Sequence, residues 1–490
     1  MMRRPLRSIF SAVAAAASCA TALAVPPDRG DLAIAYMRFE RAVAERAPTG
    51  ERLAAVNRGF DSLTGAFFAG DYATALNALA SMTAGLELPA DASEDARAAS
   101  REAWRGAVAQ RISGVPKAIV AGADFRFELA IEPLDGVFGG VAPRAIALRD
   151  AAGAEVARAP WRTDGPLVLA GKAPAAGARL HAIVERADGV AVEFGRSAVL
   201  AAPLAESRAA LAARLEALRG KPEVAAEDIE AISARLALLS DQVDRTRSAA
   251  LLADPGELVA AIGRELDRLE RGERPFAGLR GTHWRPRKLL GAQIPVACHV
   301  PPGEGPFPVV VAFHGAGGDE CMFFEGYGMG ALRRLADELG FVAVCPVTVP
   351  FAASPNLIDA LIESVGKDAS IDASRVVLVG HSLGAVTASR LAALKPERVR
   401  AAALIAGFAD IMRSKPPAPR RLWAAELDPL FALPRLEAER NKLVEAGRSL
   451  ELTVVKDQGH TLVVGAVLPE AVRWALAQAP PATQPTIRPE

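Results

Sequence analysis

A serine flanked by two glycines is the strongest chemical signal in the chain. Residues 380–384 have the sequence Gly-His-Ser-Leu-Gly, preceded by the apolar run Val-Val-Leu-Val and followed by an alanine- and leucine-rich stretch. This pattern predicts a strand, a sharp turn and a helix, an arrangement that lifts a serine hydroxyl above a sheet edge. The glycines let strand and helix approach closely, and the helix start favours developing negative charge. We therefore predict that Ser382 is a nucleophile rather than part of a plain glycine turn.

A glycine-rich loop upstream is the candidate oxyanion hole. Residues 314–318 (His-Gly-Ala-Gly-Gly) follow the apolar run Val-Val-Val-Ala-Phe. Glycines after a strand let the backbone turn an N–H toward the site, where it would bind an oxyanion together with the N–H of Leu383. By position we predict Ala316 as this donor, with Gly315 or Gly317 as alternatives. A phosphate-binding loop is the other interpretation, but neither a Walker lysine nor a GxGxxG pattern is present.

The general base is found by elimination. The chain has six histidines, and only His460 follows Ser382 with room for an acid between them. It lies just after the apolar run at 452–455, where a loop can return an imidazole to the serine. An imidazole, which titrates near neutral pH, can take the serine proton and later give it to a leaving alcohol. A surface histidine without a role is the alternative. We expect His314 to orient its own loop and His381 to pack beside the serine.

The third group is a carboxylate, for which the sequence offers three candidates. Asp428 follows the expected strand at 421–425, where it can accept a hydrogen bond from the far ring nitrogen of His460 and stabilise the imidazolium. Asp428 is our prediction. Asp410, after the preceding strand, and Glu426 are the alternatives, and a solvated loop carboxylate is the other interpretation of each.

These motifs together resemble the α/β-hydrolase superfamily. The loop HGAGG follows one strand, GHSLG follows another, and the acid and the histidine come later in that order. The resemblance covers residues 283–478, and only a short loop fits between Ile405 and Arg421, where a lid is usually inserted. This compact layout is similar to secreted polyhydroxybutyrate-depolymerase and feruloyl-esterase-like enzymes. The resemblance implies acyl transfer through Ser382, with no cofactor and with water as the final acceptor.

The element pattern of residues 281–478 predicts an α/β fold, with a mostly parallel sheet and helices on both faces. Strands and helices alternate there, and several strands are continuous apolar runs, as expected for buried parallel strands. The expected strands are 294–300, 308–313, 341–345, 376–379, 401–405, 421–424 and 450–455, and the expected helices are 330–339, 383–394 and 434–446.

Three further regions precede this expected catalytic domain. Residues 25–115 have helical periodicity and are expected to form a helical region. Residues 116–202 alternate in the strand period and contain the hairpin signal Asp188-Gly189, so we expect a small antiparallel β-sandwich. Residues 203–275 form a second helical region whose leucine stripe either binds a partner or packs inside this protein, for example against the first helices.

The first residues have the pattern of an export signal. Arginines precede an alanine-rich apolar run that ends in Ala-Leu-Ala, which predicts a signal peptide over 1–24 and a secreted or periplasmic protein. A lipid anchor through Cys19 is a minor alternative. The run is short for a membrane anchor, and no other stretch could span a bilayer, so no stable membrane span is expected after removal of the signal. Residues 479–490, rich in Pro, Ala and Thr, are expected to form a disordered tail.

Composition excludes several classes of protein. Lys plus Arg equals Asp plus Glu at 57 each, so the net charge is zero and nucleic acid is not an expected partner. Neither a CxxC pattern nor a Cys/His cluster has zinc-ligand spacing, so no metal is expected. Cys298, Cys321 and Cys345 permit one disulfide at most, and at least one of them is expected to be a small buried hydrophobe.

The sequence therefore favours an exported serine esterase or depolymerase, acting on a small-molecule or polymer-borne ester. Two alternatives stay open. A serine peptidase of the prolyl-oligopeptidase type would use the same triad on aminoacyl amides, but residues 116–202 are too few for the β-propeller that usually accompanies it. A non-catalytic binding protein with a hydrolase fold is the other, and an intact Ser, acid and His in the right order count against it.

Overall fold

The structure of the chain is a computed structural model. Two parts of the chain for which the sequence makes predictions lie outside the described residues. They are residues 1–23 of the expected signal peptide, which include Cys19, and residues 482–490 of the expected tail. Among the described helices, none combines the length and apolar character that crossing a bilayer requires. The described residues are 24–89, 91–137, 139–162, 165–240, 242, 244–410 and 417–481.

An eight-stranded sheet is the centre of the C-terminal region. Its strands are β9 (Gly281–Leu289), β10 (Ala292–Val300), β11 (Phe307–Phe313), β12 (Val342–Pro346), β13 (Ile371–His381), β14 (Val399–Ile405), β15 (Arg420–Ala425) and β16 (Glu451–Val455). Their order is β16-β15-β14-β13-β11-β12-β10-β9. Strand β10 runs antiparallel to both of its neighbours, and all other neighbours pair in parallel. The sheet is therefore mostly parallel, as predicted.

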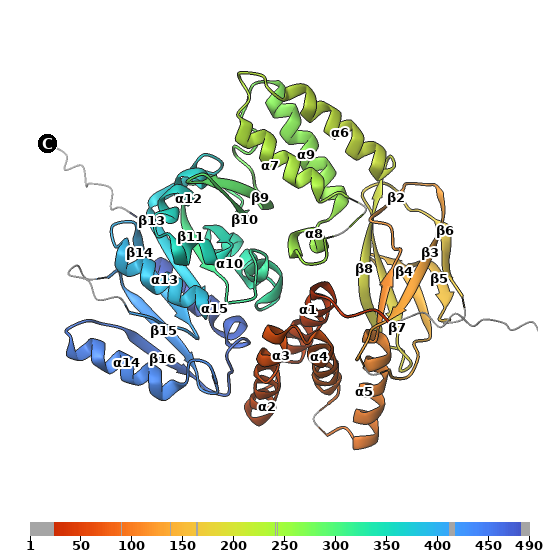
Figure 1. Cartoon of the computed structure of the whole chain (residues 1–490), viewed down its shortest axis with the longest axis horizontal. Helices are drawn as coiled ribbons and strands as arrows, with labels where there is room; N and C mark the ends of the chain where they lie inside the picture. Colours follow the sequence, from red (N-terminus) through yellow and green to blue (C-terminus); the bar gives the residue numbers. More distant parts are fainter. Residues whose placement is uncertain are drawn as a thin grey trace, which may run out of the picture.

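Helices cover both faces of this sheet (Figure 1). One face packs against α12 (Leu357–Gly366), α13 (Leu383–Leu394) and α14 (Leu433–Glu445). The other packs against α10 (Ala331–Leu339) and α15 (Val463–Ala477). Because both faces are covered, central strands such as β11 are buried along their whole length, which explains their continuous apolar sequence. The predicted α/β architecture of this region is confirmed.

Strand β9 and helices α12 and α15 were not among the expected elements. Strand β9 alternates apolar positions with basic ones, and it buries Arg285 and Arg287 instead of exposing them. Both guanidinium groups pair with the buried carboxylate of Asp368, at 2.8 Å from Arg287 Nη1. This pairing offsets the cost of burying charge at the sheet edge, and a pattern based on hydropathy alone misses it.

Five helices open the described chain. They are α1 (Arg29–Arg46), α2 (Gly50–Asp61), α3 (Thr64–Ala69), α4 (Tyr72–Glu87) and α5 (Glu94–Val108). Their shared core includes Phe39, Leu76 and Trp104, and it also takes in Leu462 from the end of the chain. These helices therefore pack against the C-terminal region, beside the segment that leads into α15 (Figure 1).

Two small sheets follow and pack face to face around a common apolar core. One has the order β1-β3-β6 and the other β2-β8-β7-β4-β5. Strands β7 and β8 pair antiparallel on either side of Asp188-Gly189, where Gly189 has φ 87°. Two details differ from expectation. Strand β2 pairs with β8 in parallel. Strand β1 lies before residue 116, in the expected helical region, and joins the sheet by pairing with β3. The strands are β1 (Gln110–Ser113), β2 (Ala118–Val120), β3 (Asp124–Pro133), β4 (Ala145–Asp150), β5 (Glu155–Pro160), β6 (Leu167–Lys172), β7 (Arg179–Glu185) and β8 (Ala191–Leu200).

A second group of helices joins these sheets to the C-terminal region. It comprises α6 (Leu204–Leu218), α7 (Ala226–Ala237), α8 (Ser248–Leu252) and α9 (Pro255–Glu270). The leucine stripe packs inside this group, around Leu215, Ile232 and Leu266, rather than against the first helices. Helix α7 also packs on β9. The stripe is therefore interior surface and not a free face for a partner.

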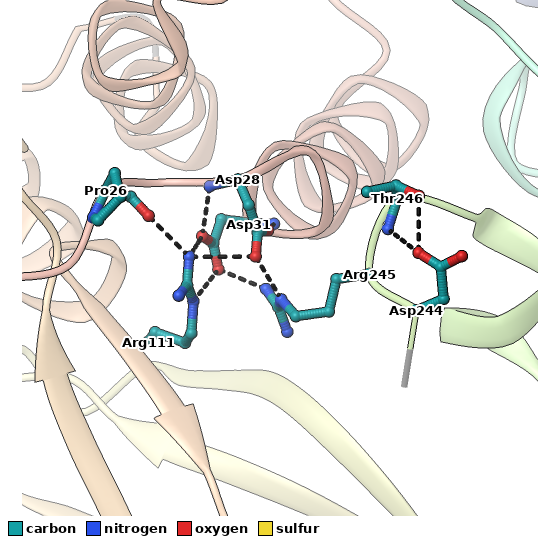
Figure 2. Close-up of polar contacts among 7 residues, drawn as sticks. All are labelled: Pro26, Asp28, Asp31, Arg111, Asp244, Arg245 and Thr246. Atoms are coloured by element: carbon teal, nitrogen blue, oxygen red, sulfur yellow. Dashed lines mark hydrogen bonds and ion pairs between the residues drawn. The ribbon is translucent and has the colours of Figure 1, made fainter. Parts of the chain in front are cut away.

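The start of α1 is held between two basic side chains from other parts of the chain (Figure 2). Asp28 caps the helix, and Asp31 completes a capping box. Arg111 from β1 donates to Asp31 Oδ2 at 2.6 Å, and Arg245, ahead of α8, donates to Asp28 Oδ2 at 2.8 Å. These contacts fix the first helix against both the β-sheets and the second helical group.

Candidate active site

Ser382 lies at a strained turn between β13 and α13. Its backbone has φ 53° and ψ −119°, and its N–H donates to the carbonyl of Ile405 at 3.0 Å. Two glycines make the turn possible. A Cβ on Gly384 would lie 1.9 Å from the carbonyl oxygen of Phe313, and one on Gly380 would lie 2.2 Å from the oxygen of Gly384. Strand, turn and neighbouring strand therefore approach more closely than any side chain would allow.

The structure brings Ser382, His460 and Asp428 together in one hydrogen-bonded chain. His460 Nε2 lies 2.9 Å from Ser382 Oγ, and His460 Nδ1 lies 2.8 Å from Asp428 Oδ2. The three residues are only 8%, 5% and 4% exposed, respectively. Because the carboxylate accepts from Nδ1–H, the neutral ring has its free lone pair at Nε2, facing the serine hydroxyl. The arrangement allows the imidazole to take the serine proton.

The carboxylate of Asp428 is itself held by the backbone. Its Oδ1 accepts the N–H groups of Leu430 at 2.8 Å and Phe431 at 2.9 Å, which leaves Oδ2 for the imidazole of His460. The ring of Phe431 stacks on that imidazole, with centroids 5.9 Å apart and planes 8° from parallel. One loop after β15 therefore orients both the acid and the ring.

The two alternative acids are engaged elsewhere. Asp410 forms ion pairs with Arg420, at 2.8 Å, and with Arg448. Glu426 is exposed, and its carboxylate accepts the backbone N–H of Asp457 at 3.0 Å. Neither is bonded to the imidazole as Asp428 is.

The predicted oxyanion loop forms a tight turn beside the serine. The N–H of Gly318 donates to the carbonyl of Gly315 at 3.2 Å, and Gly317 has φ 79°, a conformation that favours glycine at the third position of a turn. A Cβ on Gly315 would lie 3.2 Å from the Cβ of Ser382. The turn therefore lies against Ser382.

Several backbone N–H groups of the turn and of the helix start have no acceptor in the protein. Within the described part of the chain, the N–H groups of Ala316, Gly317 and Leu383 donate to no other residue. The N–H of Gly315 instead points to the hydroxyl of Tyr327, at 3.4 Å. These contacts disfavour Gly315 as the partner of Leu383 and leave Ala316, the predicted donor, and Gly317 available.

Two further histidines have both ring nitrogens engaged in hydrogen bonds with neighbouring loops. His314 Nδ1–H donates to the carbonyl of Gly315 at 2.8 Å, and its Nε2 accepts the N–H of Thr348 at 3.1 Å. His381 Nδ1 accepts from Tyr327 Oη at 2.7 Å, and its Nε2–H donates to the carbonyl of His460 at 2.9 Å. Burial lowers the pKa of both rings, that of His381 to well below its usual value, so both stay neutral.

Two residues that contact the loop of His460 were not found from the sequence. Asp61 Oδ2 accepts the backbone N–H of His460 at 2.8 Å, and Asn57 Oδ1 accepts that of Gly459 at 2.8 Å. Both lie in α2, about four hundred positions before their partners. Their spacing of four residues gave the only sequence signal, a polar pair on one helix face, which is typical of many solvated helices.

The described residues contain no group of three or more His, Cys, Asp or Glu side chains that could hold a metal ion. Cys298, Cys321 and Cys345 are free thiols. Burial raises the pKa of each thiol above its ordinary value, so none is a ready nucleophile at neutral pH.

Comparison with known proteins agrees with the fold. Residues 360–472 match the family model described as the alpha/beta hydrolase fold. The C-terminal region has the α/β-hydrolase fold. No curated protein sequence matches the chain.

Several solved structures are similar to this region. One is an S-formylglutathione hydrolase from Agrobacterium tumefaciens, 20% identical, covering 42% of this chain and 97% of that one with a TM-score of 0.35. Another is an S-formylglutathione hydrolase (FrmB) from Staphylococcus aureus, 12% identical, covering 40% and 98% with a TM-score of 0.34. A ferulic acid esterase is 11% identical and covers 41% and 98%, with a TM-score of 0.34. At these identities the likeness concerns the fold.

Proposed function

We propose that this protein is a serine hydrolase that cleaves carboxylic esters through an acyl-enzyme on Ser382. The observation that carries the proposal is the hydrogen-bonded chain from Ser382 through His460 to Asp428, at 2.9 and 2.8 Å. A serine, a base and an orienting acid at these distances are the parts of an activated nucleophile. The free N–H groups of Ala316 and Leu383 supply the oxyanion hole.

The reaction takes place in two halves. His460 takes the Ser382 proton as Oγ attacks the ester carbonyl, and Asp428 stabilises the imidazolium that forms. The two N–H groups bind the oxyanion of the tetrahedral intermediate, and the imidazolium then protonates the leaving alcohol. In the second half His460 activates water, which attacks the acyl-enzyme and releases the acid. No step requires a cofactor.

Apolar side chains around the triad support an ester with apolar or aromatic groups as the substrate. The ring of Phe431 lies on the imidazole of His460, and Phe67 of α3 lies against Gly317 in the oxyanion turn. Neighbouring Phe68 and Leu430 expose 60% and 47% of their surface, respectively. Exposed apolar groups on the segments that contact the oxyanion turn and carry Asp428 favour binding of small-molecule or polymer-borne esters. We further propose export to the periplasm or outside the cell, which the signal pattern of residues 1–24 supports.

Substrate assays with matched serine variants test this proposal. We expect turnover of p-nitrophenyl esters to exceed that of aminoacyl anilides, and Ser382→Ala to lower kcat by at least about 10³-fold. Ser374→Ala is the control, because Ser374 is exposed in the same strand, β13, and lies away from the turn.

Each other outcome has a defined meaning. Faster turnover of the anilides would identify a peptidase. Absence of turnover of both substrate classes by folded protein would favour the binding-protein alternative. An unchanged rate in Ser382→Ala would remove this serine from the mechanism.

A further inference from the structure

Helix α2 contributes two side chains to the loop that carries the catalytic base. Besides accepting the N–H of Gly459, Asn57 donates through Nδ2 to the carbonyl of Asp457 at 3.1 Å. Asp61 accepts the N–H of His460 at 2.8 Å, and a Cβ on Gly459 would lie 2.2 Å from Asp61 Oδ2. The end of α2 and the loop are therefore in direct, hydrogen-bonded contact.

With Asp61, every polar atom of His460 has a partner. The ring nitrogens bond to Ser382 and Asp428, and the backbone carbonyl accepts from His381. The backbone N–H bonds to Asp61, the one partner of the four that comes from outside the hydrolase fold. Loss of this acceptor would leave a buried N–H unpaired, a cost that the loop can relieve only by moving.

The same helical group also holds the oxyanion turn. Arg29, in the first turn of α1, donates to the carbonyl of Gly317 at 2.7 Å. The ring of Phe67 lies so close to Gly317 that a Cβ there would be 2.3 Å from Phe67 Cε1. In the sequence Arg29 stands between Asp28 and Asp31. Figure 2 shows these two carboxylates held by Arg111 and Arg245. The first helices are therefore held in place by these ion pairs while they contact the loop of His460 and the oxyanion turn.

We propose that helices α1–α3 are a built-in wall of the active site, in which Asn57, Asp61 and Arg29 are positioning residues. They hold the base and the oxyanion donors at the distances that the reaction requires. The inference rests on the proposed function, because it assigns these residues to the same serine, base and oxyanion hole. A displacement of the base by about 1 Å is enough to lower a rate by about 10²-fold.

Variants of the full-length protein test this proposal. Asp61→Ala removes the acceptor, Asp61→Asn retains an acceptor oxygen, and Asn57→Ala removes the bonds to Gly459 and Asp457. Glu51→Ala is the matched control, since Glu51 is an exposed residue of the same helix that pairs only with Arg58 among its described neighbours. We expect Asp61→Ala and Asn57→Ala to lower kcat about 10- to 100-fold with KM changed less than about threefold. We expect Asp61→Asn to recover most of kcat.

A second measurement is independent of turnover. Hydrogen exchange of the segment 457–461, followed by mass spectrometry, should become faster in Asp61→Ala than in Glu51→Ala. Equal exchange of this segment in Asp61→Ala and Glu51→Ala would overturn the inference. This comparison does not depend on whether either variant turns over substrate. Ester turnover that depends on Ser382 but is the same in Asp61→Ala, Asn57→Ala and Glu51→Ala would also overturn it, and would leave the proposed function intact. Turnover that does not depend on Ser382 would contradict the proposed function itself, whatever the exchange rates.

Discussion

Replacing Asp428 with Asn tests the role of the acid, because the structure dictates how the new amide must lie. Asp428 Oδ1 accepts two backbone N–H groups, from Leu430 and Phe431. Only the amide oxygen of Asn can take that place, so its NH2 group must face His460 Nδ1. The reverse orientation would set the NH2 against two N–H donors and lose both hydrogen bonds.

The consequence is a change of tautomer in the base. Since an NH2 group cannot accept, the proton of His460 must move from Nδ1 to Nε2, where it faces Ser382 Oγ at 2.9 Å. The base then has no lone pair for the serine proton. We expect kcat to fall by about 10⁴-fold, equivalent to about 5 kcal/mol of transition-state stabilisation.

The assay is the kcat for a p-nitrophenyl ester at about pH 8, compared with that of Glu426→Gln. Glu426 is the neighbouring exposed carboxylate, and its substitution should change kcat by less than about threefold. Retention of more than a tenth of wild-type kcat in Asp428→Asn would refute the assignment of the acid. A large loss in Glu426→Gln would move the assignment to that residue.

Two further predictions concern stability. Gly384→Ala should destabilise the fold by about 1–3 kcal/mol or more, because the new Cβ would lie 1.9 Å from the Phe313 carbonyl oxygen. Gly263→Ala, at a helical position with no neighbouring atom within 4 Å, should instead stabilise the fold by about 0.5–1 kcal/mol. Equal denaturation midpoints for the two variants would contradict this prediction. Burial raises the pKa of Asp61 to about 6, although the hydrogen bond from the backbone N–H of His460 acts in the opposite direction. The ionised form of Asp61 therefore costs stability in the folded protein, and this cost is absent at low pH and complete once the pH has risen above 6. The unfolding free energy of Asp61→Asn relative to wild type should therefore increase by up to about 3 kcal/mol between about pH 4 and pH 8, and a constant difference would show that Asp61 does not titrate in this way.

Much of the C-terminal fold could be predicted because its sequence signals are local. Strand β11 is apolar and buried along its whole length, and β14 is so except at exposed Arg400, since helices cover both faces of the sheet. The turn at Ser382 is marked by glycines at 380 and 384, and each glycine has a close backbone neighbour that explains it. Such local patterns also place Ser382 and His460 at the ends of strands, where the structure brings them together.

The contacts between the regions could not be predicted in this way. Asn57 and Asp61 look like any polar pair on a helix, and their partners lie about four hundred residues later. Strand β9 was missed because its buried Arg285 and Arg287 depend on Asp368, far along the chain. A buried polar group is explained only by its partner, and one sequence does not say which partner that is.

Trapping of the covalent intermediate tests the central claim most directly. Intact protein quenched during turnover of a slowly hydrolysed p-nitrophenyl ester should carry one acyl group, and peptide mapping should locate it on Ser382. The Ser382→Ala variant should carry none. Turnover without any acylated protein, or an acyl group on another side chain, would contradict the account.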